Sequence, residues 1–162
     1  MASLTGYNKV FASDTTAVDS TLEHPLGTRA FDTAGNEYIY LTGVTSTAVG
    51  SWVTFDEDHL TALAAANASG RVAIAMAITD SISEYGWYMI YGKHPAAKVL
   101  VGFADNGVCY LTTTAGSVDD ADVAGDLING AIGRSAGTGT PATASAAIIE
   151  LNYPHVNDTA ND

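Results

Sequence analysis

The chain has 162 residues, of which 47% are hydrophobic and only 15% are charged. This is the size and composition of one folded domain, and it excludes a chain that is disordered by composition and a highly charged coiled coil. The net charge of −12 and the sequence pI of about 4.3 argue against nucleic acid and membrane surfaces as partners, because both carry negative charge themselves. The acidity fits either simple solubility or an acidic face directed at a basic partner.

The chain has one cysteine, Cys109, so no intrachain disulfide can support the fold. Met1–Tyr7 lacks the basic start and the apolar run of a secretory signal. No stretch approaches the eighteen consecutive apolar residues of a membrane span. These features predict a soluble chain that folds in the cytoplasm.

Residues 1–26 and 152–162 show no sustained period of two or 3.6. We predict an extended N-terminal arm over 1–26, a β domain over 27–151 and an acidic C-terminal tail over 152–162. Deletion of the arm is expected to leave the domain folded.

Between the two termini, short β-favouring runs alternate with Gly, Asn and Asp. In the run 71–78, Val72, Ile74, Met76 and Ile78 alternate mostly with alanine, which predicts one bulky face and one face suited to close packing. About eight strands at this spacing predict a mainly β domain, a small β-barrel or β-sandwich, with at most one short helix. The predicted strands are 37–42, 51–55, 71–78, 85–91, 98–102, 108–112, 127–132 and 144–151.

Two local signals interrupt this series of strands. The Asn106-Gly107 step within 103–107 predicts a tight hairpin between the strands 98–102 and 108–112. Asp58 could cap a short helix within 56–67, with a strand as the alternative for this segment. The Gly-rich and Pro-containing segment 136–143 is expected to be a loop.

The sequence carries no motif for acyl-transfer catalysis, because it has neither a G-x-S-x-G elbow nor a papain-like cysteine context. Cys109 lies in an apolar run and is expected to be buried and inert. The segment 86–94 resembles a phosphate-binding loop only superficially, since it has one intervening residue too many and bulky aromatic side chains. Four isolated histidines lack the paired spacing of a transition-metal site: His24, His59, His94 and His155.

The densest carboxylate cluster lies between residues 119 and 126, where a hard cation such as Ca²⁺ would find oxygen ligands. The spacing does not match an EF-hand loop and no glutamate closes it, so we expect a solvated acidic turn and no resident cofactor or metal. A bound ion and a general acid/base pair remain as alternatives. The cluster consists of Asp119, Asp120, Asp122 and Asp126.

Five aromatic residues have three interpretations: core packing, a subunit contact or a platform for stacking sugars. Core packing is the expected one at strand spacing, and both faces of the run 85–91 should be covered. The residues are Trp52, Tyr85, Trp87, Tyr88 and Tyr91.

Several short strings resemble small structural proteins of tailed-bacteriophage heads, over roughly residues 28–156. The strings are Gly50-Ser51-Trp52-Val53, Gly70-Arg71-Val72-Ala73-Ile74-Ala75, Tyr85-Gly86-Trp87, Ala104-Asp105-Asn106, Thr114-Ala115-Gly116-Ser117-Val118-Asp119-Asp120 and Leu151-Asn152-Tyr153-Pro154.

The resemblance implies a head decoration, or cement, protein. Such a protein is a β-barrel or sandwich that binds the outside of the capsid, commonly as a trimer, and secures neighbouring major capsid subunits. It is a virion protein assembled in the host cytoplasm, and it is not an enzyme. We expect the arm, the tail and the aromatic strand to supply the contacts through Tyr7, Val10, Phe11, Trp87, Tyr88 and Tyr153.

Three other functions remain open. One is a phage tail-tube or head-tail joining protein, which would form rings or tubes. Another is a carbohydrate-binding surface module that uses Trp52 or Trp87. The last is a metal-dependent enzyme that uses the cluster between Asp119 and Asp126.

Overall fold

The computed structural model describes residues 14–139 and 145–157, and the regular structure in this part of the chain is entirely β. The predicted mainly β fold class is confirmed. The described residues contain no helix, and therefore none that is long and apolar enough to cross a membrane. The strands are β1 (Val18–Asp19), β2 (Arg29–Phe31), β3 (Glu37–Thr42), β4 (Trp52–Phe55), β5 (Thr61–Leu63), β6 (Gly70–Ala75), β7 (Tyr85–Val99), β8 (Val108–Leu111), β9 (Val118–Asp119), β10 (Leu127–Gly133) and β11 (Ser145–Val156).

All eleven strands belong to one continuous sheet with the order β2-β3-β7-β9-β8-β10-β11-β6-β4-β5, and β1 pairs with β7. An additional pairing of β7 with β6 closes a ring of six strands, β7, β9, β8, β10, β11 and β6, and β7 also pairs with β11 of this ring. The strand number exceeds the predicted eight because β1, β2, β5 and β9 have only two or three residues each, too few to show a period.

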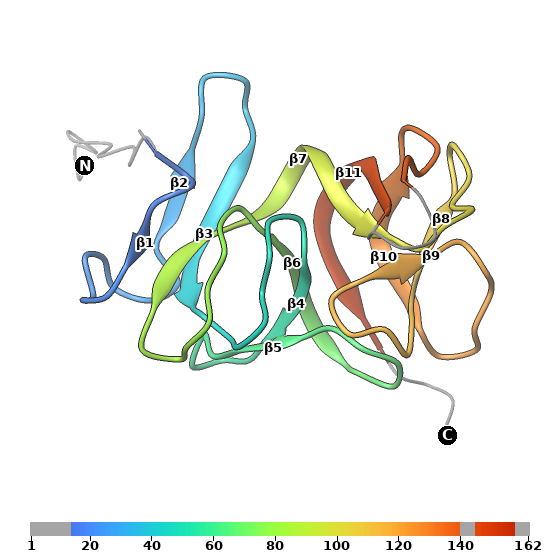
Figure 1. Ribbon diagram of the computed structural model, residues 1–162. Helices are drawn as coiled ribbons and strands as arrows, with labels where there is room; N and C mark the ends of the chain where they lie inside the picture. Colours follow the sequence, from blue (N-terminus) through green and yellow to red (C-terminus); the bar gives the residue numbers. More distant parts are fainter. Residues whose placement is uncertain (1–13, 140–144, 158–162) are drawn as a thin grey trace, which may run out of the picture.

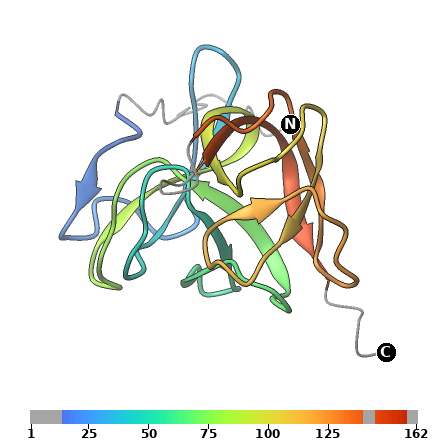
Figure 2. The same ribbon diagram turned by 45° about the vertical axis from the view of Figure 1, so that its right-hand side comes forward.

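Strand β7 organises the sheet because it pairs with other strands on both sides of the molecule (Figure 1). Its first half pairs with β3, where Tyr40 lies opposite Trp87. Its second half pairs with β11, and its last residue, Val99, pairs in parallel with Val118 of β9. Figures 1 and 2 show the N-terminal strands β1–β3 on one side of β7 and the C-terminal strands β8–β10 on the other.

Two hydrophobic clusters lie on opposite faces of β6 and β7. In β6, Val72 and Ile74 belong to the larger cluster, and Ala73 and Ala75 belong to the smaller one. This alternation was predicted from the sequence and is confirmed. The same alternation in β7 places Trp87 and Met89 in the larger cluster and Tyr88 and Ile90 in the smaller one.

The predicted hairpin between 98–102 and 108–112 is wrong. A turn is present, since the Gly107 N–H donates to the Ala104 carbonyl at 3.1 Å and Asn106 has a φ of 59°. However, β8 pairs with β9 and β10, and the segment after Val99 turns away so that Phe103 is buried in the larger cluster. A turn signal fixes the local backbone, but it does not fix the partner of the strand that follows.

The predicted helix within 56–67 is also wrong, and the alternative of a strand is confirmed for Thr61–Leu63. The Asp56 carboxylate accepts hydrogen bonds from the backbone N–H groups of Asp58 at 3.0 Å and Leu60 at 2.9 Å. His59 has a φ of 64°, which a helix does not allow. Residues 56–60 therefore form the turn of the β4–β5 hairpin.

Three predicted boundaries differ from the structure. Strand β7 continues from Tyr85 to Val99, so the predicted 98–102 is not a strand separate from the predicted 85–91. Strand β6 ends at Ala75, so Ile78 lies in a loop with 66% of its surface exposed instead of facing the core. Strand β11 continues to Val156, so the predicted tail from residue 152 begins inside a strand. Residues 158–162 and residues 140–143 of the predicted loop 136–143 lie outside the described residues.

The predicted N-terminal arm is attached to the domain over its described part, residues 14–26. Strand β1 pairs with the start of β7. Asp19 accepts a hydrogen bond from the Tyr40 hydroxyl, and the His24 ring lies 5.2 Å from the Tyr40 ring and 5.4 Å from the Trp87 ring. Tyr7, Val10 and Phe11, the predicted contact residues of the arm, lie outside the described residues.

Candidate functional site

The aspartates of the predicted cation cluster do not converge. Asp126 is buried and accepts a hydrogen bond from the Asn67 N–H at 2.7 Å, while Asp120 accepts one from the Ala104 N–H at 3.0 Å. Among the described residues, no group of three or more His, Cys, Asp or Glu side chains could hold a metal ion. The prediction of a solvated turn is wrong for Asp126, which fixes loop backbone inside the protein.

Cys109 and His94 are both buried. Burial raises the pKa of the Cys109 thiol to about 12, so the thiol stays protonated at neutral pH. Burial lowers the pKa of His94 to about 4, and its Nδ1 accepts a hydrogen bond from the Ala96 N–H at 3.2 Å. The segment 86–94 that resembles a phosphate loop lies inside β7 and forms ordinary strand pairings.

The tryptophans are core residues. Trp52 has no exposed surface and donates a hydrogen bond from its indole Nε1 to the Lys98 carbonyl at 2.9 Å. Trp87 and Tyr88 are also buried, so the predicted surface contacts through these two residues and the sugar platform on Trp52 or Trp87 are wrong.

Two tyrosines are the exposed aromatic residues of this region. Tyr91 and Tyr153 are each about half exposed, and their ring centroids lie 5.3 Å apart. Tyr153 was a predicted contact residue, and the structure places it on the surface, at the end of β11.

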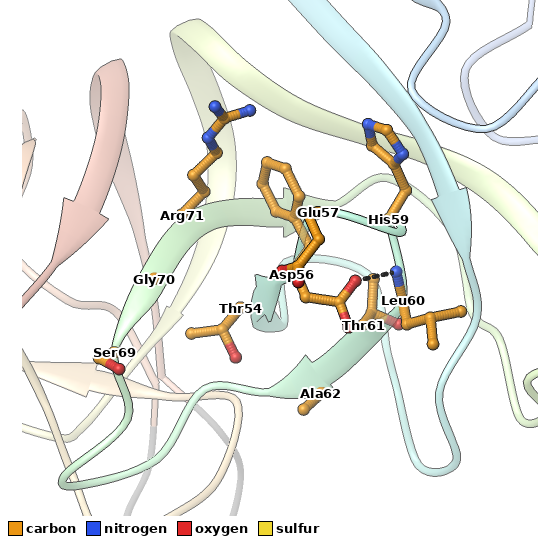
Figure 3. Close-up of a pocket in the computed structure, with 11 residues that line it drawn as sticks. Thr54, Asp56, Glu57, His59, Leu60, Thr61, Ala62, Ser69, Gly70 and Arg71 are labelled. Atoms are coloured by element: carbon orange, nitrogen blue, oxygen red, sulfur yellow. Dashed lines mark hydrogen bonds between the residues drawn. The ribbon is translucent and has the colours of Figure 1, made fainter.

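A first hollow of about 690 Å³ lies over the β4–β5 hairpin and the start of β6. Figure 3 shows the Asp56 carboxylate directed at the Leu60 backbone nitrogen, within the turn, and Arg71 pointing away from it. Because Asp56 already accepts two backbone N–H groups, its role here is to shape the turn.

A second hollow of about 450 Å³ adjoins the first and shares Phe55 and Arg71 with it. Strands β2, β4, β6, β7 and β11 all contribute to it. We call it the arginine groove, and its lining residues are Arg29, Phe55, Arg71, Val72, Ile90, Tyr153, Pro154 and His155.

Arg29 is held in place at one end of the arginine groove. Its Nη1 donates to Glu37 Oε1, and the Tyr153 hydroxyl donates to Glu37 Oε2 at 2.7 Å. The Arg29 guanidinium also lies 5.9 Å from the centre of the Tyr153 ring, within cation–π range. The bond to Glu37 raises the pKa of the Tyr153 hydroxyl, which therefore remains a donor at neutral pH.

Arg71 faces the same groove without such a partner. Within residues 14–139 and 145–157, the ion pairs are Arg29 with Glu37 and Arg134 with Glu150, and Arg71 pairs with no carboxylate. The chain has only six Lys and Arg residues, and two of them, Arg29 and Arg71, line this one hollow.

A second surface feature is formed by the loops that follow β3 and β6. Backbone and side-chain hydrogen bonds join them: Gly43 N–H to the Glu84 carbonyl at 2.6 Å, Val44 N–H to Thr79 Oγ1 at 3.3 Å and Ser46 N–H to Asp80 Oδ1 at 3.0 Å. Ile78 and Ile82 on the second loop are 66% and 61% exposed, more than any other large hydrophobic residue in the described part of the chain. We call Ile78 and Ile82 the isoleucine tip.

Neither surface feature could be predicted from the sequence. The residues of the arginine groove come from positions 29 to 155, and Arg71 and His155 meet because β6 and β11 pair there. The isoleucine tip was missed because Ile78 continued the alternating pattern of β6.

Comparison with known proteins identifies no relative of the chain. No family model, curated protein or solved structure matches the chain.

Proposed function

We propose that the chain is a non-catalytic structural protein of a tailed-bacteriophage head, which decorates the outer surface of the capsid by binding major capsid subunits. In this role it acts on the virion exterior as a homo-oligomer, with a trimer suggested by the sequence resemblance. The observation that carries the proposal is the isoleucine tip, because a decoration protein needs an exposed apolar anchor on a rigid support.

The loop that carries the isoleucine tip is hydrogen-bonded to the loop after β3. Within the second loop, Asp80 N–H donates to the Glu84 carboxylate at 2.6 Å, and Thr45 Oγ1 of the first loop donates to the Asp80 carbonyl at 3.2 Å. Burying an isoleucine side chain contributes roughly 1.5–3 kcal/mol, and a preorganised loop loses little conformational entropy on binding. Two isoleucines on such a loop are therefore suited to anchor a protein contact.

The chemistry of the described polar groups supports a non-catalytic role. The Cys109 thiol is buried and protonated, Asp126 and Asp56 bond loop backbone, and His94 is enclosed. A catalytic site would instead bring a nucleophile and a base together at an accessible position.

The test is co-sedimentation of the purified chain with capsid shells of the phage that encodes it. The double variant Ile78→Ser/Ile82→Ser is expected to bind at least about tenfold more weakly, which corresponds to about 1.4 kcal/mol. The matched control is Val101→Ser/Val123→Ser, which changes two exposed residues, 53% and 43%, on other loops. Unchanged binding of the isoleucine variant, or an equal loss in the control, would contradict the proposal.

A further inference from the structure

We propose that the arginine groove is a docking site for a carboxylate-bearing segment of a polypeptide partner, with Arg71 and Arg29 holding the carboxylate and the apolar floor holding a neighbouring side chain. This inference rests on the proposed function in one respect, namely that the partner is a protein. Beyond the proposed function, it identifies the place on this chain where an acidic segment of that partner binds.

The distribution of charge points to a carboxylate. The chain has 18 Asp and Glu residues against six Lys and Arg, yet Arg71 pairs with no carboxylate of the described residues. His155 lies opposite Arg71 in the β6–β11 pairing and lines the same groove. A concave site that gathers cations on an otherwise acidic protein attracts a local negative group.

Arg29 is already oriented for this contact. Glu37 is buried, and it takes one N–H of the guanidinium at Nη1, while Tyr153 bonds to its second oxygen. A guanidinium has five N–H donors, so most of those of Arg29 are left for a ligand. Because Glu37 and the Tyr153 ring fix the position of Arg29, a ligand would not have to order this side chain.

The floor of the groove adds an apolar requirement. Phe55 and Ile90 line it and belong to the smaller hydrophobic cluster. The volume of about 450 Å³ is within the range of ligand sites and suits one or two side chains. In an amphipathic segment, a carboxylate would contact the arginines and a neighbouring apolar side chain would contact the apolar lining residues of the groove.

Phosphate polymers and anionic membranes match it less well. A net charge of −12 repels an extended polyanion at long range, whereas a single carboxylate on a protein segment carries little of this penalty. A phosphate group would also leave the apolar floor unfilled. The observations therefore favour an acidic polypeptide segment.

The experiment uses the ¹⁵N-labelled full chain and two capped peptides, acetyl-Leu-Glu-Leu-Glu-amide and its neutral counterpart acetyl-Leu-Gln-Leu-Gln-amide, in low-salt titrations followed by NMR. The acidic peptide is expected to shift the amide signals of β2, β6 and the end of β11. The neutral peptide should bind at least about fivefold more weakly. Arg71→Gln should abolish the difference between the peptides, and Arg134→Gln, which breaks an exposed ion pair elsewhere, should preserve it.

Three results would overturn the inference. These are equal binding of the two peptides, signal shifts that map away from the groove, and a preference that survives in Arg71→Gln. Binding of the groove by the chain's own acidic residues 158–162 is the competing outcome, and it is tested with the variant Asp158→Asn/Asp162→Asn. If only this variant binds the acidic peptide, the groove holds those residues and not a partner, which is a fourth result that overturns the inference. Because no capsid is used, failure here leaves the shell-binding test of the isoleucine tip unaffected.

Discussion

The Tyr40 hydroxyl donates a hydrogen bond to the carboxylate of Asp19, which joins the N-terminal segment to strand β3. Tyr40 has no exposed surface and lies on β3, while Asp19 is on the two-residue strand β1. This bond, with the packing of His24 against Tyr40 and Trp87, explains how so short a strand keeps its position.

Removing this hydroxyl should loosen β1. In Tyr40→Phe the Asp19 carboxylate loses its donor, and we expect the free energy of unfolding to fall by about 1–3 kcal/mol. Amide hydrogen exchange at Val18 should rise more than at Ile74 in the core. The control is Tyr91→Phe on the exposed side of the sheet, which should change stability by less than about 0.5 kcal/mol. Equal effects of the two substitutions would contradict this role of the bond.

Gly50 and Gly35 form a matched pair, because both have a positive φ, 82° and 86°, in different surroundings. A Cβ at Gly50 would lie 2.2 Å from the Ala96 carbonyl oxygen, whereas a Cβ at Gly35 would meet nothing within 4 Å. The backbone of Gly50 is also fixed on both sides, by a bond to Ala75 at 2.8 Å and one from Lys98 at 2.9 Å.

Gly35→Ala should therefore cost only about 1–2 kcal/mol, the strain of the left-handed backbone. Gly50→Ala should cost at least about 3 kcal/mol, because the strand carrying Ala96 must also move. Urea denaturation of both variants gives the comparison. Similar losses would show that the close approach of the two backbones is not important for stability.

His94 should make the protein sensitive to acid. Its pKa is about 4 in the folded protein because of burial, against an ordinary value of 6.5. Between these values the unfolded chain binds a proton that the folded chain does not. The free energy of unfolding is therefore highest, as far as His94 is concerned, above pH 6.5. It falls as the pH decreases toward 4, by about 3 kcal/mol over this window.

Chemical denaturation between pH 4 and 7 checks this dependence. His94→Gln removes the titrating group and should flatten that part of the profile. If the slope is the same in His94→Gln and in the unmodified protein, carboxylates and not His94 account for the acid sensitivity.

Deletion of residues 2–13 tests the predicted role of the arm. This deletion spares Asp19 and His24, which contact the core, so the domain should stay folded while capsid binding falls. An extended segment can add to an exposed strand edge of a partner, which is the expected mode of contact. The measurement is shell co-sedimentation, and unchanged binding by the truncated protein would refute the prediction.

The sequence was sufficient where a run of β-favouring residues or a regular period of two marks a strand and its two faces. Strand β3 coincides with the predicted 37–42, and the alternation in β6 and β7 assigned side chains to the correct faces. It was insufficient where distant pairing decides the outcome. Strand β8 pairs with β9 and β10, and no local pattern between residues 98 and 112 shows this choice.

The same reason limits prediction of the site. Glu37 and Tyr153 are 116 residues apart, and their hydrogen bond depends on the arrangement of β3, β7 and β11. The sequence marked Tyr153 as a contact residue through the resemblance alone. It gave no signal that Arg29 and Arg71 line one groove, because each is the only cation in its strand.

Cryo-electron microscopy of capsid shells incubated with the purified chain tests the proposed decoration role. The proposed decoration role predicts additional density on the outer surface of the shell, at regular positions between major capsid subunits, with the isoleucine tip facing the shell. Bare shells at saturating concentration, or density confined to the portal or the tail, would contradict it.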